Sequence, residues 1–197
     1  AQLAKITKTF LKLCKQGTGI LTGSLPPGVA DTSYRDINFA LQKQGGRCII
    51  DAPVAIMQKT LISNPFLIKP NLHELEALSN KTLKTIEEVA AEARNIANQG
   101  TQYVCISLAE KGAILTGPIN SYYCNSPDIK VNSTVGAGDS MVAGLAFSFS
   151  QNQSAEQALK LAVACGAGTC LHAGTQLFNN TDLMNLSDNI NIKTLNI

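Results

Sequence analysis

The stretch that decides the fold is S-T-V-G-A-G-D-S, residues 133–140, which runs directly into the apolar segment M-V-A-G-L-A-F. We interpret it as a loop of small residues that leads into the N-terminus of a helix. Small side chains let a backbone approach a ligand closely, and the first amides of a helix can bind an anion. Asp139 can cap this helix, or it can act as a base beside the anion. Free amides next to a base suit phosphoryl transfer.

Apolar and amphipathic segments alternate on both sides of this stretch. We expect a strand from Gly19 into the turn at Pro26-Pro27-Gly28, and further strands at 47–51, 65–69 and 103–107. Between and after them we expect helices over 31–45, 54–61 and 85–98. This alternation is typical of βαβ units and predicts a parallel sheet. The length suits a single α/β domain over 1–197.

The composition limits the classes of function. Hydrophobic residues make up 45% of the chain, charged residues 15%, and the net charge is +2, which argues against disorder and gives nucleic-acid binding little support. No apolar run is long enough for a membrane span, and no signal peptide is evident. The six cysteines include no C-x-x-C pair. We interpret them as reduced, mostly buried thiols, and expect a cytoplasmic protein without a structural zinc site.

Two further segments offer polar groups at predicted strand ends. Asn71 and Glu74 have the spacing of a capping box, which is the simpler interpretation, but their oxygens also suit a hydrated Mg²⁺ ion that bridges phosphates. Ser24 is either a turn hydroxyl or a hydrogen-bond donor at the edge where open α/β sheets bind ligands. From the sequence alone, these two interpretations of Ser24 are about equally supported.

Three motifs together resemble those of the ribokinase-like (PfkB) carbohydrate kinases: S-T-V-G-A-G-D-S-M-V at 133–142, G-S-L-P-P-G at 23–28 and K-P-N at 69–71. The resemblance is strongest to the minor-type 6-phosphofructokinase group, followed by the 1-phosphofructokinase and tagatose-6-phosphate kinase groups. It implies a three-layer α/β/α sandwich with a mostly parallel sheet. The N-terminal strands of that family, with the β-lid that closes the site, are absent from this sequence.

The resemblance also implies roles for individual residues. Asp139 is the implied catalytic base, and Gly136, Ala137 and Gly138 line the anion hole. The implied nucleotide contacts are Lys69, Asn71, Ser107, Gly112, Thr134 and His172. Ser24 joins Asp139 at the sugar phosphate. Asn71 and Glu74 are the implied Mg²⁺ ligands, and Ser133, Val135, Thr169 and Gly174 are the implied K⁺ ligands. The sequence departs from the family pattern at Ala109, where glycine is usual, and at His172, where asparagine is common.

The implied reaction is ATP-dependent phosphorylation of a ketose phosphate, foremost fructose 6-phosphate to fructose 1,6-bisphosphate. Full-length members of the family imply a homodimer. An alternative is that this chain is a nucleotide-binding portion without catalysis, because the family's sugar-binding half is missing and positioning supplies much of the rate. A weaker alternative is a nucleoside or vitamin kinase of the same fold.

Overall fold

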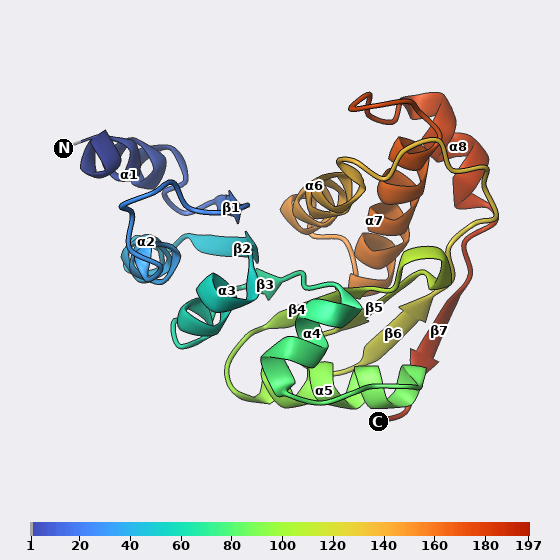
Figure 1. Ribbon diagram of the computed structural model, residues 1–197, viewed down its shortest axis with the longest axis horizontal. Helices are drawn as coiled ribbons and strands as arrows, with labels where there is room; N and C mark the ends of the chain where they lie inside the picture. The colour runs from blue at the N-terminus through green and yellow to red at the C-terminus, as the bar shows by residue number, and fades with distance from the viewer. Residues whose placement is uncertain (1) are drawn as a thin grey trace.

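A computed structural model describes residues 2–197 as one seven-stranded sheet with helices on both faces (Figure 1). The strands follow chain order across the sheet: β1 (Thr18–Thr22), β2 (Arg47–Asp51), β3 (Leu67–Ile68), β4 (Tyr103–Ser107), β5 (Ala113–Thr116), β6 (Ser121–Cys124) and β7 (Ile192–Leu195). Strands β1 to β4 are parallel, and β5, β6 and β7 are each antiparallel to the strand before them. All strands except β5 and β7 therefore point the same way.

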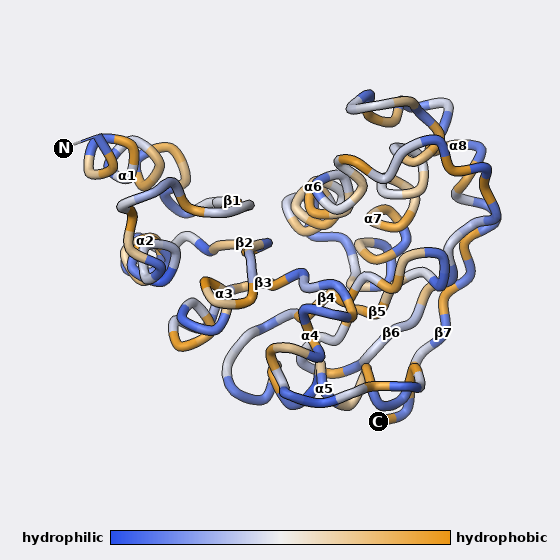
Figure 2. Tube along the Cα trace, in the orientation of Figure 1, coloured by the Kyte–Doolittle hydropathy of each residue, from blue (hydrophilic) through white to orange (hydrophobic). Residues whose placement is uncertain are grey.

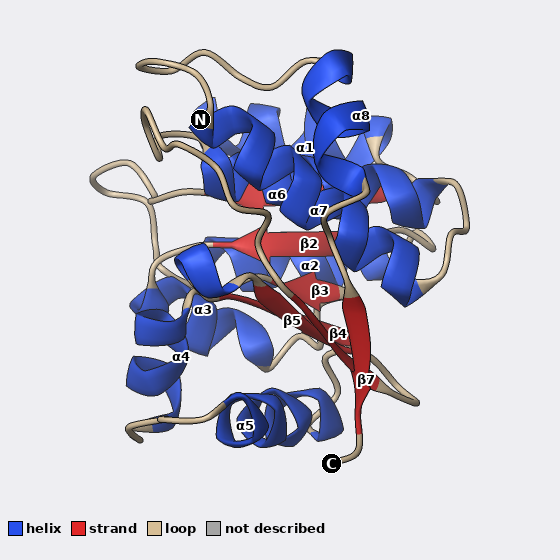
Figure 3. Ribbon diagram, turned by 90° about the vertical axis from the view of Figure 1, so that its right-hand side faces the viewer, coloured by secondary structure: helices blue, strands red, loops and turns tan. Residues whose placement is uncertain are grey.

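The helices form the two outer layers of the sandwich. They are α1 (Gln2–Leu13), α2 (Ser33–Gln42), α3 (Val54–Leu61), α4 (Leu72–Ser79), α5 (Ile86–Asn98), α6 (Ala137–Ser150), α7 (Ala155–Cys170) and α8 (Asn180–Ser187). Helices α3, α4 and α5 lie on one side of the sheet, and α6 and α7 on the other (Figure 3). The predicted α/β/α sandwich with a mostly parallel sheet is confirmed.

Two hydrophobic cores separate these layers. Along β2, Ile50 faces the core shared with α2 to α5, whereas Ile49 faces the core shared with α6 and α7. The same alternation holds for Ile68 and Leu67 in β3, because neighbouring side chains of a strand point to opposite faces. Hydrophobic and hydrophilic residues are interspersed along the outer helices, as expected for amphipathic helices that cover a sheet (Figure 2).

Most predicted elements are found close to their predicted bounds. The predicted helix over 31–45 is shorter in the structure, because a turn precedes Ser33 and Gly45 has a φ of +78° that ends any helix. The predicted strand over 65–69 is reduced to β3. A proline at position 65 cannot donate a hydrogen bond to a neighbouring strand.

The cysteines behave as small hydrophobic residues. All six are free, and four of them are buried: Cys48, Cys105, Cys124 and Cys165. Burial raises the pKa of Cys48, Cys105 and Cys124 to about 12 in each case, so these thiols stay protonated at neutral pH. Within residues 2–197, no helix combines the length and the apolar character that crossing a bilayer requires.

Candidate active site

The carboxyl ends of the four parallel strands lie side by side and carry polar residues. Thr22 ends β1, Asp51 ends β2, Lys69 follows β3 and Ser107 ends β4. Thr22 and Asp51 are register partners, and the amide of Lys69 donates to the carbonyl oxygen of Ile50 at 3.0 Å. Open α/β sheets bind ligands at this edge. The strand ends therefore form the floor of a candidate site.

The glycine turn and helix α6 meet this edge. Gly136 is the N-cap residue of α6, and its φ of 81° lies in the left-handed region that favours glycine. The carboxylate of Asp139 accepts a hydrogen bond from Thr22 Oγ1, with 3.2 Å between the oxygens, and makes no cap to the helix. The capping interpretation of Asp139 is therefore wrong. Its side chain is instead oriented toward the end of β1.

Backbone amides at the start of α6 are available to an anion. The amide of Ala137 donates to the carbonyl oxygen of Thr134 at 3.2 Å, so this predicted member of the anion hole is already engaged. Across residues 2–197, the amides of Gly138 and Asp139 make no hydrogen bond. The amide of Gly136 also makes no hydrogen bond, so Gly136 and Gly138 stay candidates for the predicted hole, and the amide of Asp139 is a further one.

A buried cation lies next to the same turn. Lys69 is only 4% exposed, and its Nζ lies 3.3 Å from Asp51 Oδ2. A Cβ atom placed on Gly138 would be 3.4 Å from Lys69 Nζ. Burial raises the pKa of Asp51, Lys69 lowers it, and the negative charges of Glu74 and Asp139 raise it further. The ammonium group is therefore close enough to the glycine turn to share an anion with its amides.

Asn71 and Glu74 form the capping box predicted for α4. The amide of Glu74 donates to Asn71 Oδ1 at 2.9 Å, and the amide of Asn71 donates to Glu74 Oε2 at 2.8 Å. A β-bridge between Asn71 and Ser107 places the start of α4 beside the end of β4. The capping interpretation is thus confirmed. It leaves Glu74 Oε1 and one lone pair of Asn71 Oδ1 without a partner in the box.

The side chains at this edge suit a cation that is held mainly by water and phosphate oxygens and only partly by the protein. Within the described part of the chain, no three side chains of His, Cys, Asp or Glu lie close enough together to hold a metal ion alone. The carboxylates of Glu74 and Asp139 nevertheless lie close enough to Asp51 to raise its pKa, and Lys69 offsets part of this negative charge. Mg²⁺ commonly binds proteins through one or two carboxylates, with water and phosphate oxygens completing the shell. This donor set suits that mode of binding.

The turn between β4 and β5 depends on backbone conformation. A Cβ atom on Gly112, whose φ is +93°, would overlap the carbonyl oxygen of Cys124, so only glycine fits. Close packing accounts for this glycine, and its nucleotide contact stays a prediction. Ala109, at the position where the family has glycine, adopts a φ of +52°. This left-handed backbone conformation is less favourable for alanine than for glycine.

The residues predicted to bind K⁺ are partly brought together. Ser133 Oγ donates to the carbonyl oxygen of Gly174 at 2.8 Å and accepts from the amide of Val135 at 3.2 Å. The hydroxyl of Thr169 is buried and lies 2.7 Å from that of Ser140. The carbonyl oxygen of Thr169 accepts a hydrogen bond from the amide of His172 at 3.2 Å, so both oxygens of Thr169 are paired and its role as a K⁺ ligand stays a prediction.

The remaining predicted residues occupy the margins of the site. Ser24 is exposed on the loop that leaves β1, and the exposed Thr134 precedes the glycine turn. His172 is half-buried just after α7, and its Nε2 lies 2.7 Å from Asp182 Oδ2. His172 is therefore not a freely exposed residue at the C-terminus of α7.

Sequence reasoning missed two members of the site, Thr22 and Asp51. Both are polar residues at the carboxyl end of a buried strand, which is the position where a parallel sheet presents side chains to ligands. That signal was available in the sequence for both residues. The pairing of Thr22 with Asp139 and of Asp51 with Lys69 was not visible there, because these contacts join distant parts of the chain.

Comparison with known proteins assigns this arrangement to a family. The family model described as "pfkB family carbohydrate kinase" matches residues 3–182. The chain belongs to this family. The ATP-dependent 6-phosphofructokinase isozyme 2 of Escherichia coli is 38% identical over 155 residues, which are 78% of this chain and 50% of that protein. The 1-phosphofructokinase of Borreliella burgdorferi is 34% identical over 169 residues, 85% of this chain and 55% of that protein.

Solved structures agree with the pfkB assignment. Phosphofructokinase-2 from Escherichia coli in complex with potassium superposes with a TM-score of 0.90 at 34% identity, covering 94% of this chain and 61% of that one. The same enzyme in complex with fructose-6-phosphate gives a TM-score of 0.87 at 31% identity, covering 94% and 60%. The chain spans about half the length of the curated relatives that it matches.

Proposed function

We propose that the complete protein transfers the γ-phosphoryl group of ATP to a hydroxyl of a ketose phosphate. The observation that carries the proposal is the carboxylate of Asp139, oriented by Thr22 beside free helix amides and the ammonium group of Lys69. Fructose 6-phosphate is the favoured acceptor, giving fructose 1,6-bisphosphate, and the similarity to isozyme 2 of Escherichia coli supports it. The 1-phosphofructokinase relatives support fructose 1-phosphate, and tagatose 6-phosphate is a third candidate acceptor.

In the proposed mechanism, Asp139 accepts the proton of the attacking hydroxyl as that oxygen approaches the γ-phosphorus. The hydrogen bond from Thr22 fixes Oδ1 and leaves Oδ2 for the hydroxyl. The amides of Gly138 and Asp139 donate to the oxygens of the phosphoryl group, and Lys69 neutralises part of their charge. Asp51 holds the Lys69 side chain in place from the neighbouring strand. Base and amides share one helical turn, so their separation is fixed before substrates bind.

Two cations are part of the proposal. Asn71 and Glu74 would hold Mg²⁺ together with phosphate oxygens and water, and the bound ion supplies charge neutralisation to the phosphates. Ser133, Val135, Thr169 and Gly174 are the proposed K⁺ ligands. The phosphofructokinase-2 structure in complex with potassium supports a role for this cation. A homodimer and a cytoplasmic location stay predictions.

A second candidate function is nucleotide binding without turnover by this chain alone. Within residues 2–197, β1 is an edge strand that pairs only with β2. Ile20 of this strand and Phe147 of the adjacent α6 are 38% and 57% exposed. An acceptor that is not held in line with the phosphorus loses much of the rate. Under this alternative, MgATP binds but no sugar phosphate is phosphorylated.

Calorimetric titration with MgATP, with and without potassium, tests the proposal first. We expect binding at one site, with higher affinity in potassium. Phosphoryl transfer to each of the three sugar phosphates is then measured. Turnover supports the kinase, and binding without turnover supports the second candidate. A folded chain that fails to bind MgATP would contradict both.

The hydrogen bond from Thr22 to Asp139 gives a smaller, separate prediction. Thr22→Val removes the donor and keeps the side-chain shape, so turnover is expected to fall about 3- to 10-fold, the range of one hydrogen bond. Thr22→Ser keeps the hydroxyl and should retain most of the activity. The melting temperature should barely change, because Thr22 is exposed. Equal turnover in the valine and serine variants would show that Thr22 does not orient the base.

A further inference from the structure

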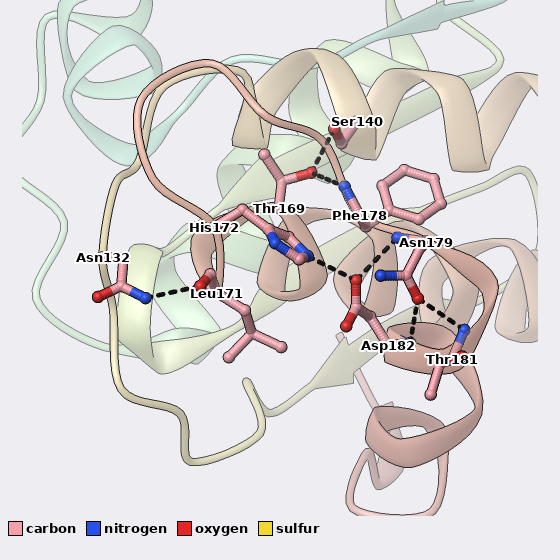
Figure 4. Close-up of polar contacts among 9 residues, drawn as sticks. All are labelled: Asn132, Ser140, Thr169, Leu171, His172, Phe178, Asn179, Thr181 and Asp182. Atoms are coloured by element: carbon pink, nitrogen blue, oxygen red, sulfur yellow. Dashed lines mark hydrogen bonds and ion pairs between the residues drawn. The ribbon is translucent and has the colours of Figure 1, made fainter.

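The loop between α7 and α8, residues 171–179, is closed by a side-chain pair at its two ends. His172 lies at the start of this α7–α8 loop, and its Nε2 is 2.7 Å from Oδ2 of Asp182 in the first turn of α8. Figure 4 shows the imidazole ring directed at that carboxylate. The two side chains are only 19% and 14% exposed. A charge-assisted bond with little exposure is stronger than an ion pair on an open surface.

The carboxylate of Asp182 serves both ends of the loop at once. The same Oδ2 accepts a hydrogen bond from the amide of Asn179 at 2.8 Å, which completes the capping box of α8. Hydrogen bonds from His172 and Asn179 lower the pKa of Asp182, so the group stays ionised and His172 is the donor. The start of the α7–α8 loop is thereby tied to its end through one oxygen atom.

The middle of the α7–α8 loop contacts the segment that precedes α6. Ser133 Oγ donates to the carbonyl oxygen of Gly174 at 2.8 Å. At the start of the loop, Asn132 Nδ2 donates to the carbonyl oxygen of Leu171 at 2.6 Å (Figure 4). A Cβ atom on Gly136 would be 3.3 Å from Leu177 Cδ2. The loop therefore packs against the glycine turn, and a shift of the loop is transmitted to that turn.

We propose that His172 and Asp182 are positioning residues that hold the α7–α8 loop against the glycine turn and so set the affinity of the site for nucleotide. This inference rests on the proposed function, because it assigns nucleotide to that turn. It differs from the earlier expectation that His172 contacts the nucleotide. The Nε2 atom of the ring is engaged by α8, so the residue acts through the loop.

Substitutions at both partners test the inference by MgATP calorimetry. His172→Phe keeps a ring without the donor, and Asp182→Ala removes the acceptor. Each is expected to weaken binding about 5- to 20-fold, part of the full value of a charge-assisted bond. His172→Gln, which restores a donor near the same position, should bind within about threefold of the unaltered chain. Where turnover is measurable, KM for ATP should rise while kcat changes less than about twofold.

A matched control separates positioning from general loss of structure. Asn179→Ala removes the other half of the α8 capping box but leaves the pair of His172 and Asp182 intact. It should lower the melting temperature as the loss of a helix cap does, yet leave MgATP affinity within about twofold. Hydrogen exchange should show faster exchange in residues 171–179 only in the variants that break the pair.

The pattern of affinities across these variants distinguishes a positioning role of His172 and Asp182 from the alternatives. Weakened binding in Asn179→Ala equal to that in Asp182→Ala would overturn the inference in favour of fraying of α8. Weakened binding in His172→Phe alone would overturn it in favour of direct contact between His172 and the nucleotide. If His172→Phe does not fold, Asp182→Ala and His172→Gln still decide. Failure of the unaltered chain to bind MgATP would overturn the proposed function itself, whereas unchanged affinity in every variant would overturn only the role of the loop.

Discussion

Replacing Asp139 with asparagine is expected to reduce phosphoryl transfer by about 10²- to 10⁴-fold, the usual contribution of a general base. Asparagine has nearly the same shape and can still accept the hydrogen bond from Thr22 Oγ1, so the turn should keep its geometry. It cannot accept a proton from the attacking hydroxyl at neutral pH. The loss should therefore appear in kcat, with the dissociation constant for MgATP changed less than about twofold.

Asp128→Asn is the matched control for this experiment. Asp128 is exposed on the loop that precedes the glycine turn, and the same chemical change there should leave turnover unaltered. Should the chain alone not turn over, joining it to the N-terminal portion of isozyme 2 from Escherichia coli gives an assayable background. Equal losses of turnover and MgATP affinity in Asp139→Asn would contradict the role of a base and indicate a structural one.

The second large effect is expected for Lys69→Met. The ammonium group of Lys69 is buried against Asp51, and removing one partner of a buried ion pair typically costs about 3–5 kcal/mol, because the other charge is left uncompensated. The free energy of unfolding, measured with denaturant, should fall by that amount at neutral pH. MgATP affinity should fall as well, because the cation beside the glycine turn is lost.

The pH dependence of this effect follows from Asp51. Its pKa in the folded protein is raised, chiefly by burial, so ionisation of Asp51 lowers stability as pH rises from the unfolded-state pKa through the folded one. Lys69→Met removes the influence that lowers this pKa, so the loss of stability extends to higher pH. The difference between variant and unaltered chain should therefore shrink as pH falls and Asp51 takes up a proton.

Two comparisons check that the buried pair is responsible. Asp51→Asn combined with Lys69→Met leaves no unpaired charge and should recover much of the lost stability. Lys59→Met breaks the pair with Asp31, whose side chains are 48% and 50% exposed, and should cost no more than about 1 kcal/mol. A cost in Lys59→Met as large as that in Lys69→Met would refute the argument from burial.

Local chemistry explains why much of the fold could be predicted. Helix α5 follows the capping residue Thr85 and repeats its apolar positions at helical spacing, so its predicted bounds were nearly correct. Strand β2 is an apolar run that ends in an acid. Each of these patterns involves residues that are close in the sequence, and the folded chain makes the same local contacts that the pattern predicts. The capping box at Asn71 was equally visible.

The parts of the site that escaped prediction depend on contacts across the sheet. Whether Asp139 caps α6 or faces β1 is decided by where α6 packs, and nothing near Asp139 in the sequence encodes this. The amide of Ala137 is lost to Thr134 through a local turn whose geometry the glycines allow but do not dictate. His172 likewise gains its role from Asp182, a residue of the next helix.

The hydrogen bond from Thr22 to Asp139 joins residues 117 positions apart, and the other groups of the site come from three further strand ends. No contiguous segment contains the site, so an unfolded or half-folded chain has no affinity for its ligand. A ligand that binds only the folded chain, present at 100 times its dissociation constant, would add about 2.7 kcal/mol to the free energy of unfolding. If the proposed function holds, the fraction of chain open to proteases would then follow the supply of nucleotide.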